Sequence, residues 1–426
     1  MEKIIAELSD IIWGPYLLFL LVFTGIYFSF RLNFLQIFRL PKAVSYIFLK
    51  EKDCSEGDVS AFASLCTAIA ATVGTGNIVG VAMAIKVGGP GAIFWMWVAG
   101  FFGMATKYAE CLLGVKYRVL DKKGEMTGGP MHYIPVALGV KWPGIFFAFC
   151  GMLVALFGIG TIPQMNAITE ASSLALNFSP ALTTAILVML VSLTIFGGIK
   201  KISMVSQFVI PLMASAYLGA GFYILCFNYD LIWPTLTKII TSAFNFTSLS
   251  GGVAGYSVLM AMRHGIARGV FSNESGLGSA SIAAAAAKTN SPVRQGLISM
   301  TGTFLDTLVI CTMTGIIIIL SGVWESPQNL LAETGGSLIT TQAFATFIPQ
   351  SGLYIVNIGL IFFAFTTIIG WNFYGEKCTQ FIFGEKGIIY YRALFISIIA
   401  VSSFVPLKIV WELAEQANLF WPLRPQ

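Results

Sequence analysis

A cluster of small and polar residues interrupts one long apolar segment of this chain. The segment runs from Ala61 to Val87, and residues 70–80 within it contain three glycines, two threonines and an asparagine. Glycine destabilises a helix interior by about 1 kcal/mol relative to alanine, and unwound backbone at membrane depth is tolerated only where it is buried in protein or lines a cavity. Interrupted helices of this kind form the binding sites of secondary transporters. A packing face of small residues is the alternative, but packing alone does not require Asn77.

A second cluster, residues 272–278, interrupts another apolar segment and includes Glu274. This acid could bind an amine, or it could fix the loop by accepting backbone N–H bonds, and we favour the second role. A further acid, Asp306, lies inside an apolar segment, where a carboxyl group is costly and is a functional candidate by default. The alternative is a structural acid bonded to Thr303 or to another span.

The composition is that of a membrane protein. The 426 residues are 56% hydrophobic and 11% charged, whereas soluble domains are about 25% charged. The net charge of +5 does not indicate nucleic acid as a partner, because the basic residues lie between apolar segments. The seven cysteines lie mostly inside apolar runs without metal-ligand spacing, and we interpret them as free thiols. The N-terminus lacks the features of a signal peptide.

We predict ten full membrane spans, since about 20 apolar residues cross a bilayer. The fourth and seventh are too long for a straight crossing, so they must be tilted, broken or extended by surface helices. The spans are expected near residues 11–30, 61–87, 91–115, 143–178, 181–197, 203–227, 252–287, 295–320, 353–375 and 387–404, and an eleventh begins near Ile409.

The distribution of Lys and Arg predicts the orientation. With the N-terminus outside, 17 of the 25 basic residues lie in inner loops, as the positive-inside rule requires. Residues 33–50 are typical of an amphipathic helix on the inner membrane surface, and residues 335–348 form a second amphipathic candidate, outside.

The two interrupted spans occupy matching positions in two sets of five spans, 2–6 and 7–11. Span 2 starts inside and span 7 starts outside, which is typical of an inverted repeat with the binding site at the repeat interface. We therefore predict one transmembrane transport domain over residues 1–426. It would consist of an N-terminal helix and surface helix (1–58), a first repeat (59–228) and a second repeat (229–426). Residues 409–420 are too few to cross the bilayer, so the last helix is expected to be truncated.

The motifs resemble those of the alanine or glycine:cation symporter family. The resemblance rests on residues 74–84, 88–97, 128–133 and 269–279, with Asp306, Thr307 and residues 371–376, and it extends over about residues 10 to 415. It implies an all-α polytopic membrane protein of LeuT-type five-plus-five inverted-repeat fold with an extra N-terminal helix. It also implies Na⁺-coupled uptake of alanine, glycine or similar small amino acids in the cell membrane.

The resemblance also implies a first Na⁺ site, and the residues themselves suggest a second. One would use the carbonyls of Ala70 and Val73 with the hydroxyls of Thr366 and Thr367. Adjacent threonines could instead bond to carbonyls of their own helix. A second site would use Asn77 with Asn273 or Asp306.

The substrate site follows from the need to hold a zwitterion. Free N–H groups at a helix break suit a carboxylate, so we assign this role to Gly74, Thr75 and Gly76. The resemblance places a substrate-contacting glutamine at Gln164, just after Pro163. Trp371 shares a helix face with Thr367 and could close the pocket for the small side chain. From the second cluster, the predicted substrate site also includes Ser275 and Gly276. The alternatives are a packing glutamine and an interfacial tryptophan.

Other groups are given structural roles. We expect Lys107 and Glu110 to form an ion pair, and His132 to be structural. We expect no enzyme, because the sequence has neither a P-loop nor a His/Cys cluster. The rival functions are an uncoupled channel, a proton-coupled carrier on the same fold in which Asp306 carries the proton, and an inactive truncated member of the family. The expected partners are a small neutral amino acid, Na⁺ and the lipid bilayer, and the sequence leaves the oligomeric state open.

Overall fold

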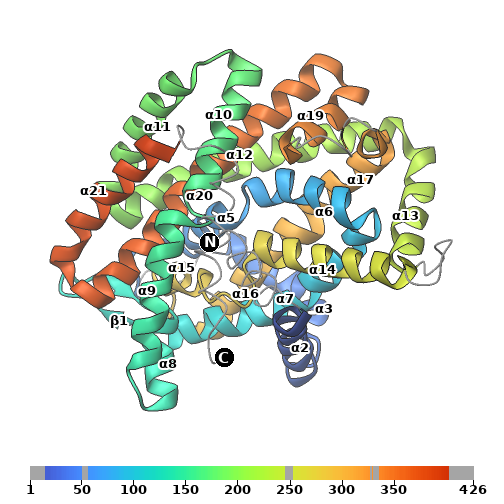
Figure 1. Cartoon of the computed structure of the whole chain (residues 1–426). Helices are drawn as coiled ribbons and strands as arrows, with labels where there is room; N and C mark the ends of the chain where they lie inside the picture. Colours follow the sequence, from blue (N-terminus) through green and yellow to red (C-terminus); the bar gives the residue numbers. More distant parts are fainter. Residues whose placement is uncertain (1–14, 50–55, 245–252, 327–328, 330–334, 403–426) are drawn as a thin grey trace.

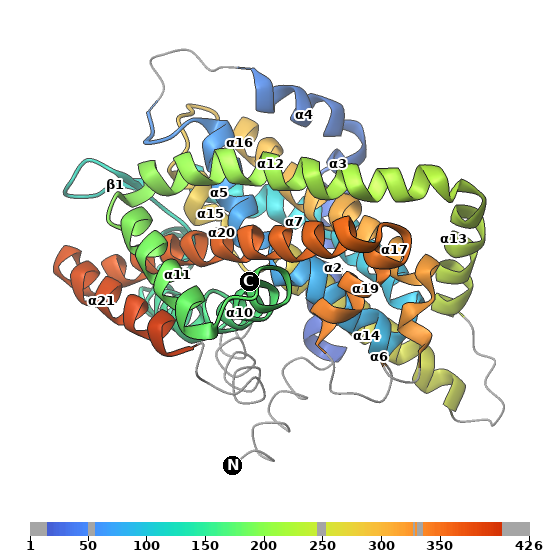
Figure 2. The ribbon, with the colours of Figure 1, turned by 90° about the horizontal axis from the view of Figure 1, so that it is seen from above.

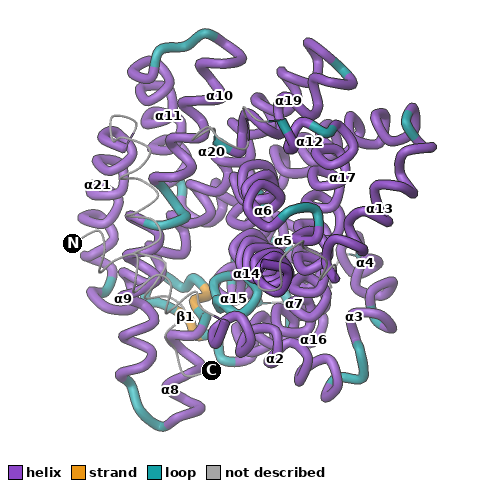
Figure 3. The backbone as a smooth tube through the Cα atoms, turned by 45° about the vertical axis from the view of Figure 1, so that its right-hand side comes forward, coloured by secondary structure: helices purple, strands orange, loops and turns teal. Residues whose placement is uncertain are grey.

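The residues that the structure describes fold into packed helices with one small hairpin (Figures 1 and 3). The computed structural model describes residues 15–49, 56–244, 253–326, 329 and 335–402. The expected incomplete helix after Ile409 lies outside these residues. In Figure 2, α12 and α20 run side by side across the molecule.

The first half of the chain begins with a peripheral helix that packs on α7. Its elements are α2 (Pro15–Arg31), α3 (Leu35–Phe38), α4 (Leu40–Phe48), α5 (Ala61–Thr72), the π-helix η1 (Gly76–Gly80), α6 (Val81–Gly88), α7 (Gly91–Lys116), β1 (Val119–Leu120), β2 (Met126–Thr127), α8 (Pro130–Leu138), α9 (Trp142–Phe157), α10 (Ile162–Leu176), α11 (Pro180–Ile195), α12 (Gly198–Phe227) and α13 (Tyr229–Phe244).

The second half begins with the other interrupted span. Its elements are α14 (Val253–Asn273), α15 (Ala280–Ala285), α16 (Pro292–Thr303), the π-helix η2 (Phe304–Cys311), α17 (Thr312–Ser321), the 3₁₀ turn η3 (Val323–Glu325), α19 (Gly336–Phe347), α20 (Pro349–Phe383) and α21 (Glu385–Ser402).

Helix starts and stops follow local chemistry. Ser60, Ser179 and Ser291 cap α5, α11 and α16 by accepting the backbone N–H three residues later. Proline at the first position of α11 and α16 costs no hydrogen bond, because that N–H has no helical partner. At the other end, α17 stops at Gly322, whose φ of 70° suits glycine.

Both expected breaks are present. The segment 61–88 bends by 50° between α5 and η1, and α14 ends at Asn273 before a loop that leads to α15. Val59 pairs with Ala287, while Gly88 packs against Ala261 at the far end. The two broken spans therefore lie side by side and run in opposite directions. An inverted repeat requires this pairing, and the relation between the remaining helices of the two halves stays a prediction.

Several expected spans differ in detail. The fourth is broken at residues 158–161, between α9 and α10, and the seventh at residues 274–279. By length and composition, four described helices can cross a membrane, and the bent pair 61–72 and 76–88 makes a fifth. α7 carries Lys107 and Glu110, and other expected spans are short or interrupted, so the number of ten crossings stays a prediction.

Connections between spans contain structure that the hydropathy pattern did not indicate. The surface helix expected at 33–50 is divided into α3 and α4, with Asn33 and Phe34 left-handed before α3. The candidate at 335–348 is α19. The helices α8 and α13 and the β1–β2 hairpin were not predicted.

Apolar side chains cover both the interior and the outer surface. Trp371, Tyr217 and Tyr374 are among the largest fully buried side chains, whereas Phe208 and Phe222 on α12 are 71% and 66% exposed. In a membrane such exposed apolar side chains contact lipid, which solvates them well. The polar residues discussed below are therefore enclosed by helices and not by water.

Candidate functional site

The first break is held by neutral side chains. Gly74 donates its N–H to Asn77 Oδ1 at 2.9 Å, which replaces a helical hydrogen bond lost at the break. A β-carbon on Gly74 would overlap the Thr367 hydroxyl oxygen and lie 3.2 Å from Gln164 Oε1. A β-carbon on Gly76 would lie 3.1 Å from the Ser272 Cα, which is also a tight contact. Glycine is therefore required by close approach from three other helices.

Gln164 joins the first break to the break in the fourth span. Its Nε2 donates to Thr75 Oγ1 and to the Ile159 carbonyl, each at 3.0 Å, and the Thr75 N–H donates to Oε1 at 3.4 Å. Pro163 lies in the first turn of α10, so the break just before it leaves the Ile159 carbonyl available. The last of the three bonds is long, so a better anionic acceptor can replace it.

Of the two threonines of α20, only Thr367 bonds to the first break. Thr367 Oγ1 donates to the Val73 carbonyl at 3.3 Å and to Phe363 at 3.0 Å, whereas Thr366 Oγ1 donates to Phe363 at 2.8 Å. Both hydroxyls thus bond to their own helix, which was the alternative expected for them. Ala70 and Val73 are fully buried beside this helix. Each hydroxyl keeps lone pairs that can bind a cation.

Asp306 connects the two breaks. Its Oδ1 accepts from Asn77 Nδ2 of the first break at 2.7 Å, and both oxygens accept from Ser272 Oγ of the second, at 3.1 and 3.0 Å. Thr307 Oγ1 donates to Oδ2 at 2.7 Å. Asp306 is completely buried. Of these partners the Asn77 amide nitrogen can only donate, whereas the Ser272 and Thr307 hydroxyls can donate or accept.

The remaining residues of the second break face α7 and α16. Asn273 Nδ2 donates to Thr307 Oγ1 at 3.0 Å, and so reaches Asp306 through Thr307. Ser275 Oγ is bonded to Thr303 Oγ1 at 3.0 Å, and Gly276 lines a cavity on the opposite side. The structure does not bring Ser275 and Gly276 to the cluster of Gly74 and Gln164.

Sequence reasoning missed Ser272 and Cys311. Cys311 Sγ lies 3.3 Å from Asn77 Nδ2 and 3.5 Å from Ser272 Oγ. It follows Asp306 by five residues, a spacing that shares one face only in a π-helix such as η2. Ser272 could have been identified from its position beside Asn273 in the second cluster. The geometry of η2 had no sequence signal.

Glu274 links the second break to Trp371. The residue is left-handed, with a φ of 55°, and its side chain is fully buried. Oε1 accepts from Trp371 Nε1 at 2.9 Å and Oε2 from Ser279 Oγ at 2.6 Å. Glu274 therefore fixes the loop through side chains and not through the backbone N–H bonds that we expected. Trp371 also packs against Gly160, where a β-carbon would lie 2.6 Å from the Trp371 Cβ.

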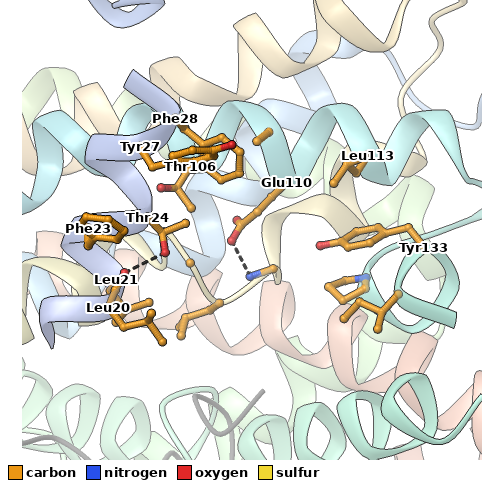
Figure 4. A pocket seen from close by; sticks show the side chains of 16 residues that line it. Leu20, Leu21, Phe23, Thr24, Tyr27, Phe28, Thr106, Glu110, Leu113 and Tyr133 are labelled. Atoms are coloured by element: carbon orange, nitrogen blue, oxygen red, sulfur yellow. Dashed lines mark hydrogen bonds between the residues drawn. The ribbon is translucent and has the colours of Figure 1, made fainter. Parts of the chain in front are cut away.

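One face of α7 covers the second break. A β-carbon on Gly103 would lie 3.0 Å from Ser275 Oγ, and Glu110 Oε1 accepts the Gly278 N–H at 3.1 Å. Figure 4 shows this bond at the wall of a cavity of about 440 Å³ between α2, α7 and α8. Lys107, between the two, makes no ion pair with any described residue, so the expected pair with Glu110 is not formed. Glu110 is directed instead to the backbone of the break.

A group of charged side chains surrounds the β1–β2 hairpin, away from the polar clusters at the breaks. Lys377 of α20 lies 3.5 Å from Asp121 Oδ2 and 3.2 Å from Glu125 Oε2. Burial raises the pKa of Asp121, but hydrogen bonds from Gln380 and backbone N–H groups and the charge of Lys377 outweigh it, so the pKa lies below its usual value. Arg118 donates to the carbonyls of Ala285, the last residue of α15, and of Ala287 and Thr289, which follow it. The hairpin therefore ties α15 to α20.

The opposite side of the first break is closed by α19. Thr340 Oγ1 donates to the Ile78 carbonyl at 2.8 Å, and so satisfies an acceptor within η1. Gly336, at the start of α19, packs directly on the Val79 carbonyl. The polar clusters at the two breaks thus have protein on both sides.

Comparisons with known proteins agree with one another. A model of the sodium:alanine symporter family matches residues 1–422. An uncharacterised transporter of Haemophilus influenzae is 52% identical over 420 residues, which cover 98% of this chain and 91% of that protein. The sodium/alanine symporter AgcS of Methanococcus maripaludis is 46% identical over 421 residues, with the same coverage of 98% and 91%. The crystal structure of MhsT in complex with L-phenylalanine matches with a TM-score of 0.59 at 14% identity, over 86% of this chain and 87% of MhsT, and so shows a common fold.

Proposed function

The chain belongs to the sodium:alanine symporter family, a family of transporters and not of enzymes, and from this premise we propose that it couples the uptake of alanine, glycine or a similar small amino acid to Na⁺. It is a multi-pass, all-α membrane protein with a LeuT-type fold. The observation that carries the proposal is the position of Asp306, whose carboxylate is bonded to both broken helices at once. An ion bound there would sense the geometry of both breaks.

We assign the first Na⁺ to the carbonyls of Ala70 and Val73 with the hydroxyls of Thr366 and Thr367. The contact between Thr367 Oγ1 and the Val73 carbonyl, at 3.3 Å, supports this assignment because it puts two of the four oxygens together. We assign the second Na⁺ to Asp306 and Asn77, with Asn273 joined to them through Thr307. Carboxylate, carbonyl and hydroxyl oxygens are the ligands that hard cations prefer.

We assign the amino acid to the space beside Gly74, Thr75 and Gly76. Its carboxylate would replace Gln164 Oε1 as acceptor of the Thr75 N–H, a bond that is 3.4 Å long in this structure. Gln164 would then turn its amide toward the ligand. Trp371, one turn along α20 from Thr367, would limit the size of the side chain. Ser275 and Gly276 lie on the α7 side of the second break and would support its loop without touching the amino acid.

The proposed orientation has the N-terminus outside the cell membrane. It rests on the basic residues of the predicted inner loops, which include Arg118 and Lys377 in the ionic cluster around the hairpin. Cells with a higher Na⁺ concentration outside would then accumulate the amino acid.

Coupling to protons is the alternative on the same fold. Asp306 would carry the proton, but its oxygens accept hydrogen bonds from Asn77, Ser272 and Thr307. A proton on the carboxyl group would be accepted only if the Ser272 or Thr307 hydroxyl turned, because the Asn77 amide nitrogen can only donate. This arrangement favours a metal cation over a proton.

Uptake of labelled alanine and glycine into proteoliposomes tests the proposal. An inward Na⁺ gradient at fixed pH should drive accumulation, and choline in place of Na⁺ should abolish it. A parallel arm with a pH gradient and no Na⁺ should give no accumulation. Equal uptake in Na⁺ and choline contradicts Na⁺ coupling, and accumulation in the pH arm supports the proton-coupled alternative.

A further inference from the structure

Lys107 is a buried cation for which the proposed function provides no role. Its side chain is 3% exposed, and Nζ has no hydrogen-bond partner among the described residues. A buried ammonium without a partner is costly, so it is rarely kept without a reason. The inference below rests on the proposed function and concerns the same site.

The position of Lys107 on α7 directs it to the second break. Gly103, one turn before it, packs against Ser275, and Glu110, about one turn after it, accepts the Gly278 N–H. Residues three and four apart share a helix face. Thr106 and Glu110 line the lateral cavity of Figure 4, whereas Lys107 is not among the lining residues. Lys107 therefore lies between α7 and the unwound segment.

The two acids at the second break have no ion-pair partner among the described residues. Glu274 is bonded to Trp371 and Ser279, and Asp306 to Asn77, Ser272 and Thr307, all of which are neutral. Lys107 interacts electrostatically with both carboxyl groups, but it lies within 4 Å of neither. Its single positive charge thus offsets part of their negative charge without direct contact.

We propose that Lys107 is a tethered counter-cation that moves onto the carboxylates of Asp306 and Glu274 when the transported cation has left. The lysine stem is long and flexible, so the ammonium can move by several ångströms without backbone change. Na⁺ and the ammonium then compete for the same oxygens. With the ammonium in place, the unloaded transporter buries less uncompensated charge and can reorient without cargo.

The experiment compares two modes of transport in proteoliposomes. Net uptake into empty vesicles requires the unloaded protein to return, whereas exchange of labelled for unlabelled alanine with Na⁺ on both sides does not. Lys107→Gln should reduce net uptake about tenfold and leave exchange within about twofold, since only the return step loses its cation. Lys107→Arg, which keeps the charge, should retain net uptake. Lys116→Gln, an exposed lysine at the end of the same helix, is the matched control and should change neither rate.

A measurement of Na⁺ binding tests the proposal without a transport assay. NaCl, compared with choline chloride, should raise the melting temperature of the purified protein. Competition predicts that Lys107→Gln lowers the Na⁺ concentration for half-maximal stabilisation by about tenfold, while Lys107→Arg and Lys116→Gln leave it unchanged. A variant that elutes as the wild type does on size exclusion but needs as much or more Na⁺ overturns the proposal. Equal losses of exchange and net uptake in Lys107→Gln also overturn it, because they indicate a role in binding or folding.

These outcomes separate the two proposals. A wild type that exchanges alanine without any response to Na⁺ contradicts the proposed Na⁺ coupling, and the ratio of net uptake to exchange in Lys107→Gln still decides the role of Lys107. A wild type that binds Na⁺ but does not transport alanine contradicts the proposed substrate. The change in the Na⁺ concentration for half-maximal stabilisation in Lys107→Gln then decides the role of Lys107.

Discussion

The two broken helices hold their unwound backbone by different means. Between residues 70 and 80 the first break has no ionisable side chain, and Gly74 and Gly76 pack closely against Thr367, Gln164 and Ser272. The second break contains Glu274, contacts Asp306 and Glu110, and faces Lys107. The first break therefore depends on shape and backbone dipoles, and the second on charge. We infer that the first break is sensitive to substitutions that change side-chain volume, and that the second is sensitive to substitutions that change charge.

The largest effect is expected from charge removal at nearly constant volume. Asp306→Asn should reduce Na⁺-driven alanine uptake at least about 100-fold, because the amide keeps the size of the carboxylate but loses the negative charge that would hold the cation beside Asn77 and Ser272. Uptake in proteoliposomes measures it. Glu325→Gln, an exposed acid paired with Lys238, is the control and should stay near wild type. Activity of Asp306→Asn within threefold of wild type would show that the second break does not depend on charge.

The matching test of the first break adds volume without charge. Gly74→Ala should lower uptake by about tenfold or more, since its β-carbon meets the Thr367 hydroxyl and overpacking of this kind costs about 1–3 kcal/mol. Gly219→Ala on α12 is the control, because a β-carbon there has open space. If both variants transport equally, close packing is not what the first break requires.

Trp371 tests the connection between the two breaks. Trp371→Phe keeps an aromatic side chain but removes the hydrogen bond to Glu274. The apparent alanine affinity should fall about fivefold, because the lost bond acts through Glu274 and not on the ligand directly. Trp371→Ala should in addition let leucine compete with alanine. Unchanged competition by leucine in Trp371→Ala would remove Trp371 from the substrate pocket.

The smallest effect concerns acid stability beneath the second break, where Pro130 of α8 packs on Gly278. Burial, with the charge of Lys377, lowers the pKa of His132 from its usual 6.5 to about 4. A lowered pKa in the folded state means that stability is complete above pH 6.5 and is lost as the pH falls toward 4. His132→Gln should abolish that loss, about 1–2 kcal/mol between pH 7 and pH 4. Melting temperatures at pH 7 and pH 4.5 measure it, and an equal acid shift in both proteins would contradict it.

The sequence predicted the breaks better than it predicted their contacts. Glycine and asparagine clusters inside apolar runs mark unwound helix directly, and an acid such as Asp306 stands out in an apolar segment. The direction in which each side chain points depends on tertiary packing. For this reason Ser275 and Gly276 were grouped with Gly74, although they face α7 and the lateral cavity.

Two other features had no local signal. A π-helix uses the same residue types as an α-helix, so the contact of Cys311 with Asn77 could not be derived from spacing. The spacing of Lys107 and Glu110 on a helix favours an ion pair. However, the Gly278 N–H competes for Glu110, and only the fold brings these two residues together. The hairpin at residues 119–127 is short and lies between spans, where hydropathy gives little information.

The widened turn at η2 has an evolutionary consequence. A π-helical segment is equivalent to an α-helix that has gained a residue, and the helix on either side keeps its faces. A relative that lacks one residue between Phe304 and Cys311 would thus still fit α16 and α17 against the same neighbours. If the missing residue lay between Asp306 and Cys311, the two would be four apart in an α-helix and would still share a face. If it lay before Asp306, they would stay five apart and would no longer share one. The position of a single-residue gap in such a relative would therefore indicate whether it keeps Cys311 on the same face as Asp306, and with it the contact of Cys311 with Asn77.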